Sequence, residues 1–171
     1  WSVQRERGLN DLINLWVKKV YPYNKNLKLF IFGINLSKGK TFKINHQRYN
    51  IFFKGRVNKN TLIKYYTNSL GMICLGYDET FCLNAIEAMS MGLPVISLGE
   101  TALNEIVINN KNGYKVNNLD KIHLKIIKFL KLSHASKVKL SKSSVNFSSQ
   151  YNFDQIKKKW NKLILSKFTK V

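Results

Sequence analysis

The stretch from Gly71 to Gly99, GMICLGYDETFCLNAIEAMSMGLPVISLG, most constrains what this chain can fold into. Its two ends are apolar runs of strand length, and the segment Thr80–Met91 between them has apolar residues at helical spacing. The stretch therefore predicts a strand, a loop, a helix and a second strand. Two carboxylates, Glu79 and Glu87, interrupt this apolar setting, and they make the stretch the first candidate for a site.

The rest of the chain repeats the alternation of strands and helices. We expect helices at residues 8–21, 58–68 and 101–107, and strands at 27–33, 50–53, 70–75, 94–98 and 114–116. The near-continuous apolar run 27–33 predicts a strand buried on both faces, as in a parallel sheet. Strands separated by helices predict an α/β domain of three layers, with a parallel sheet and helices on both faces.

From Leu119 onward the sequence predicts basic, amphipathic helices. The last of them carries one apolar stripe, made of Phe153, Ile156, Trp160, Leu163 and Ile164. We expect these helices to pack on the core rather than to bind a membrane. The chain of 171 residues is then a single domain, with an α/β core over 1–130 and a helical tail over 131–171.

The cysteines and the first residue bear on the setting of the protein. Cys74 and Cys82 lie in apolar runs without a Cys or His at metal spacing, so they are predicted to be reduced core residues. No metal and no cofactor is implied. The sequence begins with Trp1 and contains no leader and no membrane-spanning run, so we expect a cytoplasmic part of a longer protein.

The net charge of +20 leaves two interpretations open. Clustered cations attract the phosphates of nucleic acids and of anionic membranes. The excess is nearly all lysine, however, with arginine only at Arg5, Arg7, Arg48 and Arg56, and it could equally reflect the base composition of the source genome.

The loop after the strand 70–75 lies where an open parallel sheet binds ligands, at the carboxyl ends of its strands. Thr80 is expected to cap the following helix, which leaves the backbone amides of Phe81, Cys82 and Leu83 free to bind a phosphate or sugar oxygen. Glu79 at the mouth of this helix suits the hydroxyls of a neutral polyol. Its alternative role is a surface carboxylate that compensates the helix dipole.

Glu87 is the only charged residue of a helix crowded with Ala, Ile and Met, and we expect it to be partly buried. A buried carboxylate needs hydrogen-bond donors, which vicinal hydroxyls would supply. Arg5 and Arg7 stand before the N-terminus of the first helix, where the helix dipole disfavours cations unless an anion lies between them. This pattern indicates an anion site, and a solvated turn is the alternative.

The pattern of Glu79, seven residues, Glu87, Ala88-Met89, Gly92 and Pro94-Val95-Ile96 resembles the signature of retaining family-4 glycosyltransferases, the glycosyl transferases group 1. Other segments resemble the same family: Arg7-Gly8-Leu9, Leu27–Gly33, Gly55-Arg56-Val57, Glu105-Ile106-Val107 and Asn112-Gly113. The resemblance spans residues 2–130. It implies a Rossmann-like domain, one half of a GT-B fold, with the donor-binding role of the family's C-terminal half.

By this resemblance Glu87 would hold the ribose hydroxyls of a nucleotide-diphosphate sugar, and Glu79 would contact the transferred sugar as the catalytic residue. The resemblance further implies that the helix start at Thr80, with the amides of Phe81, Cys82 and Leu83, contacts the sugar and the phosphates. Arg7 would lie on the pyrophosphate, and the turn at Arg56 and Val57 would lie near the base. Arg7 replaces a usual lysine, and Thr80, Cys82 and Thr101-Ala102 replace usual glycines, which leaves the identity of the donor open.

The implied function is binding of a nucleotide-sugar donor by a hexosyltransferase whose acceptor, a glycan or a lipid-linked saccharide, is held by an N-terminal domain absent from this chain. Alone, the chain is expected to bind donor without transferring sugar. A basic face could also hold such an enzyme at the inner surface of a membrane. The alternative is a non-catalytic basic module that binds nucleic acid or an anionic membrane through its lysine-rich helices.

Overall fold

The computed structural model describes residues 8–33, 46–76, 80–99 and 102–168. The strands in this part are β1 (Leu29–Phe32), β2 (Ile51–Gly55), β3 (Met72–Cys74), β4 (Val95–Leu98) and β5 (Gly113–Val116). The α-helices are α1 (Leu9–Leu15), α2 (Lys59–Thr67), α3 (Leu83–Ser90), α4 (Leu103–Ile106), α5 (Ile122–Leu130), α6 (His134–Ser148) and α7 (Phe153–Phe168). Short helical turns are the π-helical η2 (Trp16–Val20) and the 3-10 turns η3 (Gln47–Tyr49), η4 (Leu119–Lys121) and η5 (Ser149–Tyr151).

Every pairing between these strands is parallel, which confirms the predicted α/β class. The described strands form two sheets, one in the order β1-β2 and one in the order β3-β4-β5. The classic doubly wound sheet has six strands in the order 3-2-1-4-5-6. Without its first strand, such a sheet would consist of the pair 3-2 and the triplet 4-5-6, which is how the strands of this chain are divided. The two sheets therefore correspond to the two flanks of one Rossmann-like sheet, between which no described strand lies.

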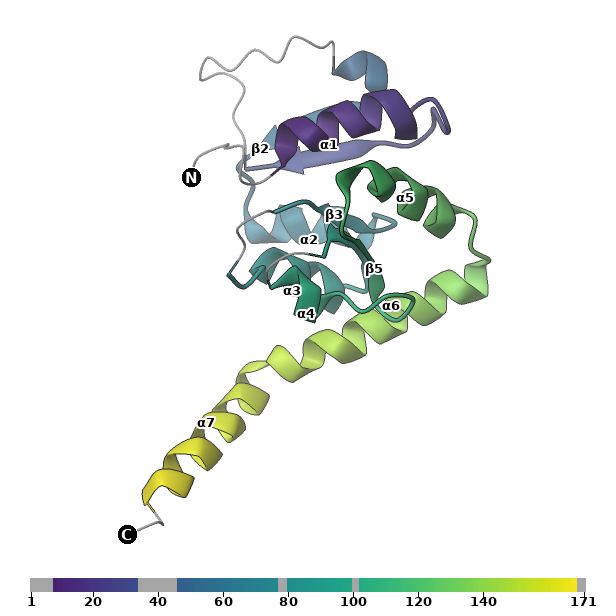
Figure 1. The fold of residues 1–171 in the computed structure, drawn as a ribbon. Helices are drawn as coiled ribbons and strands as arrows, with labels where there is room; N and C mark the ends of the chain where they lie inside the picture. Colours follow the sequence, from purple (N-terminus) through teal and green to yellow (C-terminus); the bar gives the residue numbers. More distant parts are fainter. Residues whose placement is uncertain (1–7, 34–45, 77–79, 100–101, 169–171) are drawn as a thin grey trace.

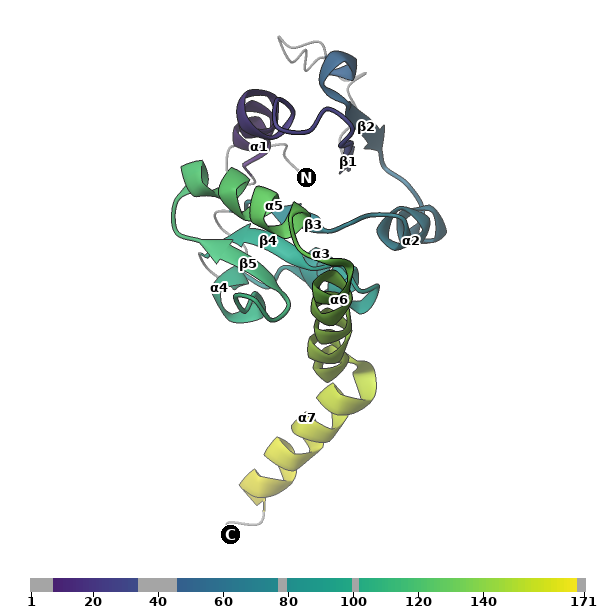
Figure 2. The same cartoon turned by 90° about the vertical axis from the view of Figure 1, so that its right-hand side faces the viewer.

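Two apolar clusters lie on opposite faces of the triplet, so the three layers are also confirmed (Figure 2). Along β4, Ile96 and Leu98 belong to the cluster shared with α1, η2 and α5, whereas Val95 belongs to the cluster shared with α3 and α4. All four residues of β4 are buried, because helices cover both of its faces. This strand has the environment that its unbroken apolar sequence predicted.

Strand β1 differs from its prediction of burial on both faces. Leu29 and Ile31 are buried, while Phe30 and Phe32 are only half-buried. The latter two pack on the ring of Tyr65 from α2, with ring centroids 5.0 Å apart in each pair. One helix over a two-stranded sheet shields this face only partly, so the apolar run alternates between buried and half-buried positions.

The N-terminal helix forms as predicted, as α1 followed by η2, and ends before Pro22. Its residues Ile13, Trp16 and Val20 are buried. The indole Nε1 of Trp16 donates a hydrogen bond to the backbone oxygen of Tyr49, at 2.9 Å, and so fastens this helix to the segment that enters β2. Helix α1 and the β1-β2 pair lie together at one end of the molecule (Figure 1).

The C-terminal tail follows its prediction in part. Helix α5 buries Ile122, Ile126 and Phe129, and α6 packs along α3, so both are attached to the core. Helix α7 extends away from the body, and its described side chains at 153–166 are nearly all exposed (Figure 1). The prediction that its apolar stripe packs on the core is wrong, because no other described element of the chain covers this helix. No described helix is both long enough and apolar enough to cross a membrane.

Candidate functional site

The candidate site surrounds the start of α3, after the carboxyl end of β3. Leu75 and Gly76, which continue β3, are buried, whereas Thr80 and Phe81 before the helix are exposed. Glu79 belongs to residues 77–79, outside the described part, and so does Arg7, since the description of the N-terminal segment starts at Gly8. The predicted roles of these two side chains therefore stay predictions.

The prediction that Thr80 caps this helix is wrong. Helix α3 begins at Leu83, and the cap position is Cys82, with φ −63° and ψ 80° and no hydrogen bond from its side chain. The backbone oxygen of Cys82 instead accepts from the amide of Ala85 at 3.0 Å. The Cys82 side chain is 3 % exposed within the apolar cluster of α3 and α4, so burial of this side chain, rather than capping chemistry at Thr80, decides where the helix starts.

This shift moves the amides that the helix leaves free. In an α-helix the first amides have no partner inside the helix. The amides of Ala85 and Ile86 bond to the backbone oxygen of Cys82, so within the described part of the chain the amides of α3 that remain for an anion are those of Leu83 and Asn84. Of the three amides predicted from the sequence, only that of Leu83 belongs to the helix. Cys82 is the cap residue, and Phe81 precedes the cap.

Glu87 is exposed, so the prediction of a partly buried carboxylate is wrong. The helix turns Ala85, Ile86 and Met89 into the apolar cluster. Ala88 is buried as well, and the residues of α3 that face solvent are Leu83, Asn84, Glu87 and Ser90. The side chain of Glu87 lies one turn after that of Leu83 on this exposed face, and the amides at the start of α3 point out of the N-terminal end of the same helix.

Tyr66 of α2 is a residue near this site that the sequence did not single out. Burial, then the negative charge of Glu87, then Cys82 and Cys74 raise its pKa to about 12. The hydroxyl group is therefore protonated throughout the physiological range and close enough to feel the Glu87 carboxylate. In the sequence, Tyr66 is one of several apolar or aromatic residues of the helix predicted at 58–68. Helical spacing does not distinguish a tyrosine with a polar role from one that only packs.

The turn after β2 lies at the carboxyl end of its strand, as predicted. Gly55 has a positive φ of 65°, which a glycine adopts without strain, Arg56 is exposed and Val57 is half-buried. Asn58 caps α2, since its side-chain oxygen accepts from the amide of Thr61 at 2.8 Å. The structure thus places Tyr66 of α2 within electrostatic range of Glu87 of α3, and Arg56 is exposed before the opposite end of α2.

Asn112 and Gly113, the last pair in the sequence resemblance, have structural roles. The buried Asn112 side chain accepts from the amide of Ile108 at 2.7 Å and donates to the backbone oxygen of Ile106 at 2.9 Å. A Cβ atom on Gly113 would lie 1.9 Å from the backbone oxygen of Val95. Only glycine fits beside β4 at this point, so this pair holds the turn into β5.

A hollow on the described surface runs along the outer side of α6, away from these residues. It is lined by Ala135, Val138, Lys139, Lys142, Ser143 and Asn146. All of these come from one helix, and none is a predicted site residue. Among the described residues, no three His, Cys, Asp or Glu side chains gather as metal ligands would.

The family model of the glycosyl transferases group 1 matches residues 2–147. Among curated proteins no sequence matches significantly. Solved structures share the fold at low identity. A mutant of S. aureus TarM, in complex with fondaparinux, alpha-GlcNAc-glycerol and UDP, is 23% identical with a TM-score of 0.78, over 94% of this chain and 33% of TarM.

Two further structures have the same fold. The pneumococcal O-GlcNAc transferase GtfA, in complex with UDP and GlcNAc, is 20% identical with a TM-score of 0.74, over 95% of this chain and 34% of GtfA. The C-terminal domain of LpcC, a group 1 family glycosyl transferase from Francisella tularensis, is 19% identical with a TM-score of 0.71, over 88% of this chain and 83% of that domain. This chain thus spans about a third of the length of TarM and GtfA, and most of the length of an isolated C-terminal domain.

Proposed function

This chain belongs to the glycosyl transferases group 1 family, and we propose that it forms the half of a hexosyltransferase that binds the nucleotide-diphosphate sugar donor. The observation that carries the proposal is the exposed side of α3. There the amides of Leu83 and Asn84, which have no hydrogen-bond partner among the described residues, lie one turn before Glu87 and after the carboxyl end of a parallel strand. Doubly wound sheets bind nucleotides at this kind of edge.

The two kinds of group on α3 match the two ends of a nucleotide diphosphate. Amides at a helix start donate hydrogen bonds to phosphate oxygens, and the helix dipole favours their negative charge. A carboxylate only accepts, so Glu87 suits the donor hydroxyls of the ribose. UDP is present in the TarM and GtfA complexes, which supports a nucleotide-diphosphate sugar as the class of donor for this chain.

The chemical step is departure of the nucleoside diphosphate from the sugar as the acceptor hydroxyl attacks. Positive charge directed at the departing diphosphate stabilises the transition state. Arg7 and the start of α3 are the groups that we assign to this task, and Glu79 is assigned to the transferred sugar. Arg56 and Val57 are assigned to the side of the base, and retention of configuration is carried over from the family.

The acceptor, a glycan or a lipid-linked saccharide, is assigned to a part of a longer protein. The chain spans about a third of TarM and GtfA, and its α7 exposes an apolar stripe that isolated domains rarely leave uncovered. Without that part the chain binds donor and does not transfer sugar. We place the protein in the cytoplasm, where nucleotide sugars are made.

Calorimetric titration of the chain with UDP-glucose, UDP-N-acetylglucosamine and UDP tests the proposal. Glu87→Gln removes the charge and keeps the shape, and we expect it to weaken binding of the preferred ligand by about 1–3 kcal/mol, because charged hydrogen bonds to ribose are lost. Asp120→Asn is the matched control, since it removes an exposed carboxylate outside the site. Equal affinity of Glu87→Gln and the parent protein would overturn the assignment of Glu87.

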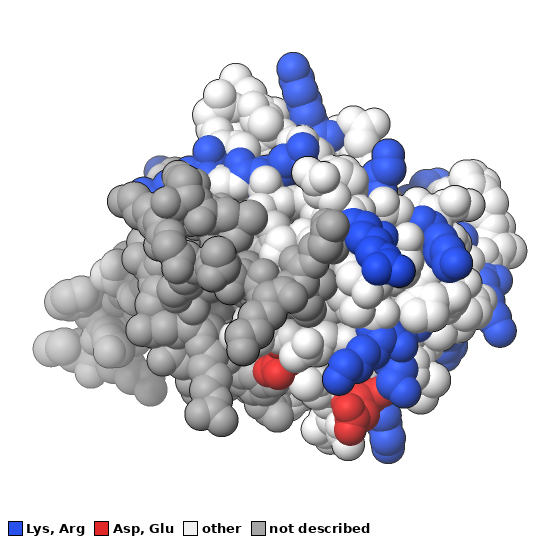
Figure 3. Space-filling model, turned by 90° about the horizontal axis from the view of Figure 1, so that it is seen from above, with Lys and Arg blue, Asp and Glu red and all other residues white. Residues whose placement is uncertain are grey.

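A second candidate function rests on α7 and on the basic surface. Lysine and arginine are spread over the described part of the face seen from above, with little acidic surface between them (Figure 3). On α7 the residues Lys157, Lys158, Lys159 and Lys162 accompany the exposed apolar stripe. An amphipathic helix of this kind can lie on an anionic membrane, either as the whole function or as an addition to sugar transfer. Flotation with vesicles that contain or lack phosphatidylserine tests this candidate, which predicts binding only to the vesicles that contain it. Glu87→Gln should leave this vesicle binding unchanged.

A further inference from the structure

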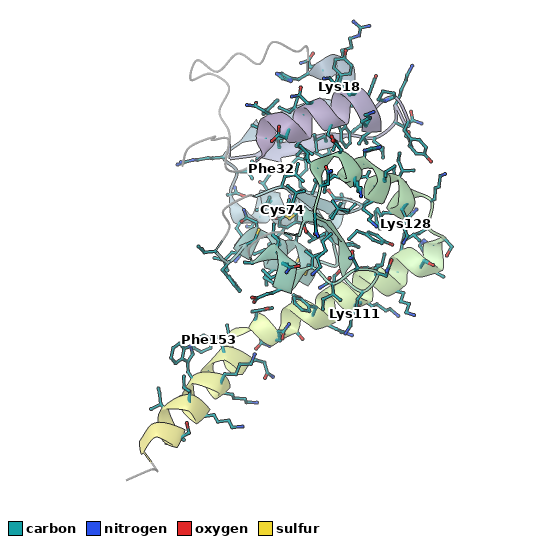
Figure 4. The ribbon with its side chains drawn as sticks, viewed as in Figure 1. Lys18, Phe32, Cys74, Lys111, Lys128 and Phe153 are labelled. Carbon is teal, nitrogen blue, oxygen red and sulfur yellow. The ribbon has the colours of Figure 1, made fainter. Side chains whose placement is uncertain are left out.

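The two cysteines of the chain are in contact beneath the candidate site. The Sγ atoms of Cys74 and Cys82 are 3.4 Å apart, and both residues are thiols in this structure. Cys74 is the last residue of β3, and Cys82 is the cap residue of α3. Figure 4 places Cys74 inside the body of the molecule, in the region of α3.

This contact is close to the geometry of a disulfide. A disulfide requires sulfur atoms about 2 Å apart, with Cβ atoms about 3.8 Å apart. Sulfur atoms already in contact can close this difference by rotation about χ1 and a small shift of the backbone. Cys82 stands directly before the first residue of α3, and its backbone oxygen accepts from the amides of Ala85 and Ile86, so a shift of Cys82 acts on the first turn of this helix.

The surroundings give the two thiols unequal access to solvent. Cys82 is 3 % exposed, and Cys74 is half-buried. Both pack in the apolar cluster of α3 and α4, and their charges contribute to raising the pKa of Tyr66, so this side chain lies within electrostatic range of both. A thiol reagent therefore meets Cys74 first, and Cys82 is the neighbour that can resolve the product.

We propose that Cys74 and Cys82 form a reversible disulfide that moves the start of α3 and thereby weakens donor binding. The oxidant is a low-molecular-weight disulfide such as glutathione disulfide. The Cys74 thiolate attacks one sulfur of the reagent and releases one thiol, which leaves a mixed disulfide on Cys74. Cys82 then attacks the Cys74 sulfur and releases the second thiol, so the two protein thiols lose two electrons and their protons pass to the released thiols.

The effect on the donor follows from the position of Cys82, and this step rests on the proposed function. The amides of Leu83 and Asn84 come directly after Cys82 in the chain. Hydrogen bonds to a phosphate depend on separations of about 2.9 Å, and they weaken when donors move by a fraction of an ångström to an ångström. Closing the disulfide pulls the cap residue toward β3 and takes these amides away from the phosphate position.

The first experiment detects the bond itself. The folded chain is equilibrated with reduced and oxidised glutathione at a series of ratios, quenched with acid, and analysed by intact mass and peptide mapping. We expect an internal Cys74–Cys82 disulfide that dithiothreitol reverses. Cys82→Ala should stop the reaction at a glutathione adduct on Cys74, because the resolving thiol is gone. Absence of the internal disulfide at the most oxidising ratio would overturn the proposal.

The second experiment separates the consequence of the bond from the proposed function. Amide exchange of Leu83 and Asn84 is compared between the reduced and the oxidised chain, and UDP affinity is measured on both. We expect altered exchange at these amides and an affinity about tenfold lower in the oxidised chain, with no such change for glutathione-treated Cys74→Ser. Unchanged exchange would overturn the movement of α3. Failure of the reduced chain to bind UDP would instead count against the proposed function, and the mass and exchange results would still decide the disulfide.

Discussion

Helices α5 and α7 share an amphipathic pattern and have opposite environments. Both are rich in lysine, and both carry an apolar stripe at helical spacing. Phe129 of α5 is 5 % exposed, whereas Trp160 of α7 is 59 % exposed and Phe153 is 77 % exposed. Figure 4 shows Phe153 at the start of α7, on the segment that leaves the body. The comparison teaches that an amphipathic pattern specifies a helix with an apolar side and does not specify what covers that side.

The largest expected difference between the two helices is in global stability. Phe129→Ala empties a packed position of the core, where the ring lies beside Gly71, and should lower the free energy of unfolding by about 3–5 kcal/mol. Trp160→Ala should change it by less than about 0.5 kcal/mol, because this side chain packs on little of the described chain. Urea denaturation followed by circular dichroism measures both. A large loss for Trp160→Ala would show that α7 packs on the body in solution.

A smaller difference is expected at the two caps. The Ser133 hydroxyl oxygen accepts from the amide of Ser136 at the start of α6, and the Asn152 side chain accepts from the amide of Gln155 in the first turn of α7. Ser133→Ala should lower global stability by about 1 kcal/mol, since α6 unfolds with the core. Asn152→Ala should reduce helix content and leave the main unfolding transition in place, because α7 depends on local interactions. Amide exchange along α7 in Asn152→Ala measures the loss of helix content. A loss of core stability in Asn152→Ala as large as that in Ser133→Ala would contradict the prediction.

The smallest expected effect concerns charge on α7. Lys162→Glu replaces the repulsion between Lys158 and Lys162 by an opposite-charge pair and leaves the pair of Asp154 and Lys158 in place, which should stabilise an isolated helix by about 0.2–0.5 kcal/mol. The helix content of α7 should rise slightly, and the rise should disappear at high salt. Lys158→Glu is the matched control, because its new carboxylate lies four residues before Lys162 but also four residues after Asp154, so that the gain and the loss cancel. Equal responses of the two variants at all salt concentrations would mean that α7 is held by contacts outside itself.

Some features of the candidate site could likewise be predicted from the sequence pattern, whereas others depend on tertiary packing. The order of strand, loop and helix around Glu79 and Glu87 could be predicted, because apolar periodicity survives in a single sequence. The exposure of Glu87 could not be predicted, since it depends on which side of α3 packs against the apolar cluster. The sequence predicts an apolar helix, and only the structure shows that Ala85, Ile86 and Met89 form its buried side.

The start of α3 was misplaced for a related reason. Capping rules select Thr80 from the sequence, because a threonine before a helical pattern is a usual cap. In the structure, burial of Cys82 outweighs the hydrogen bond that a threonine cap would contribute. The contact between Cys82 and Cys74 belongs to the same packing and has no signal in the spacing of the two residues.

The sequence by itself determined the α/β class, the parallel strands and helices in their order, and the glycosyltransferase motif, because these depend on local periodicity and on residue types at short spacing. Tertiary structure alone decided the division of the described strands into two sheets, the starting residue of α3, the electrostatic influence of Glu87 on Tyr66, and the exposure of α7. These features depend on which surfaces meet across long separations in the chain. Burial free energy depends on that meeting, whereas the pattern of a segment records only that it has an apolar side.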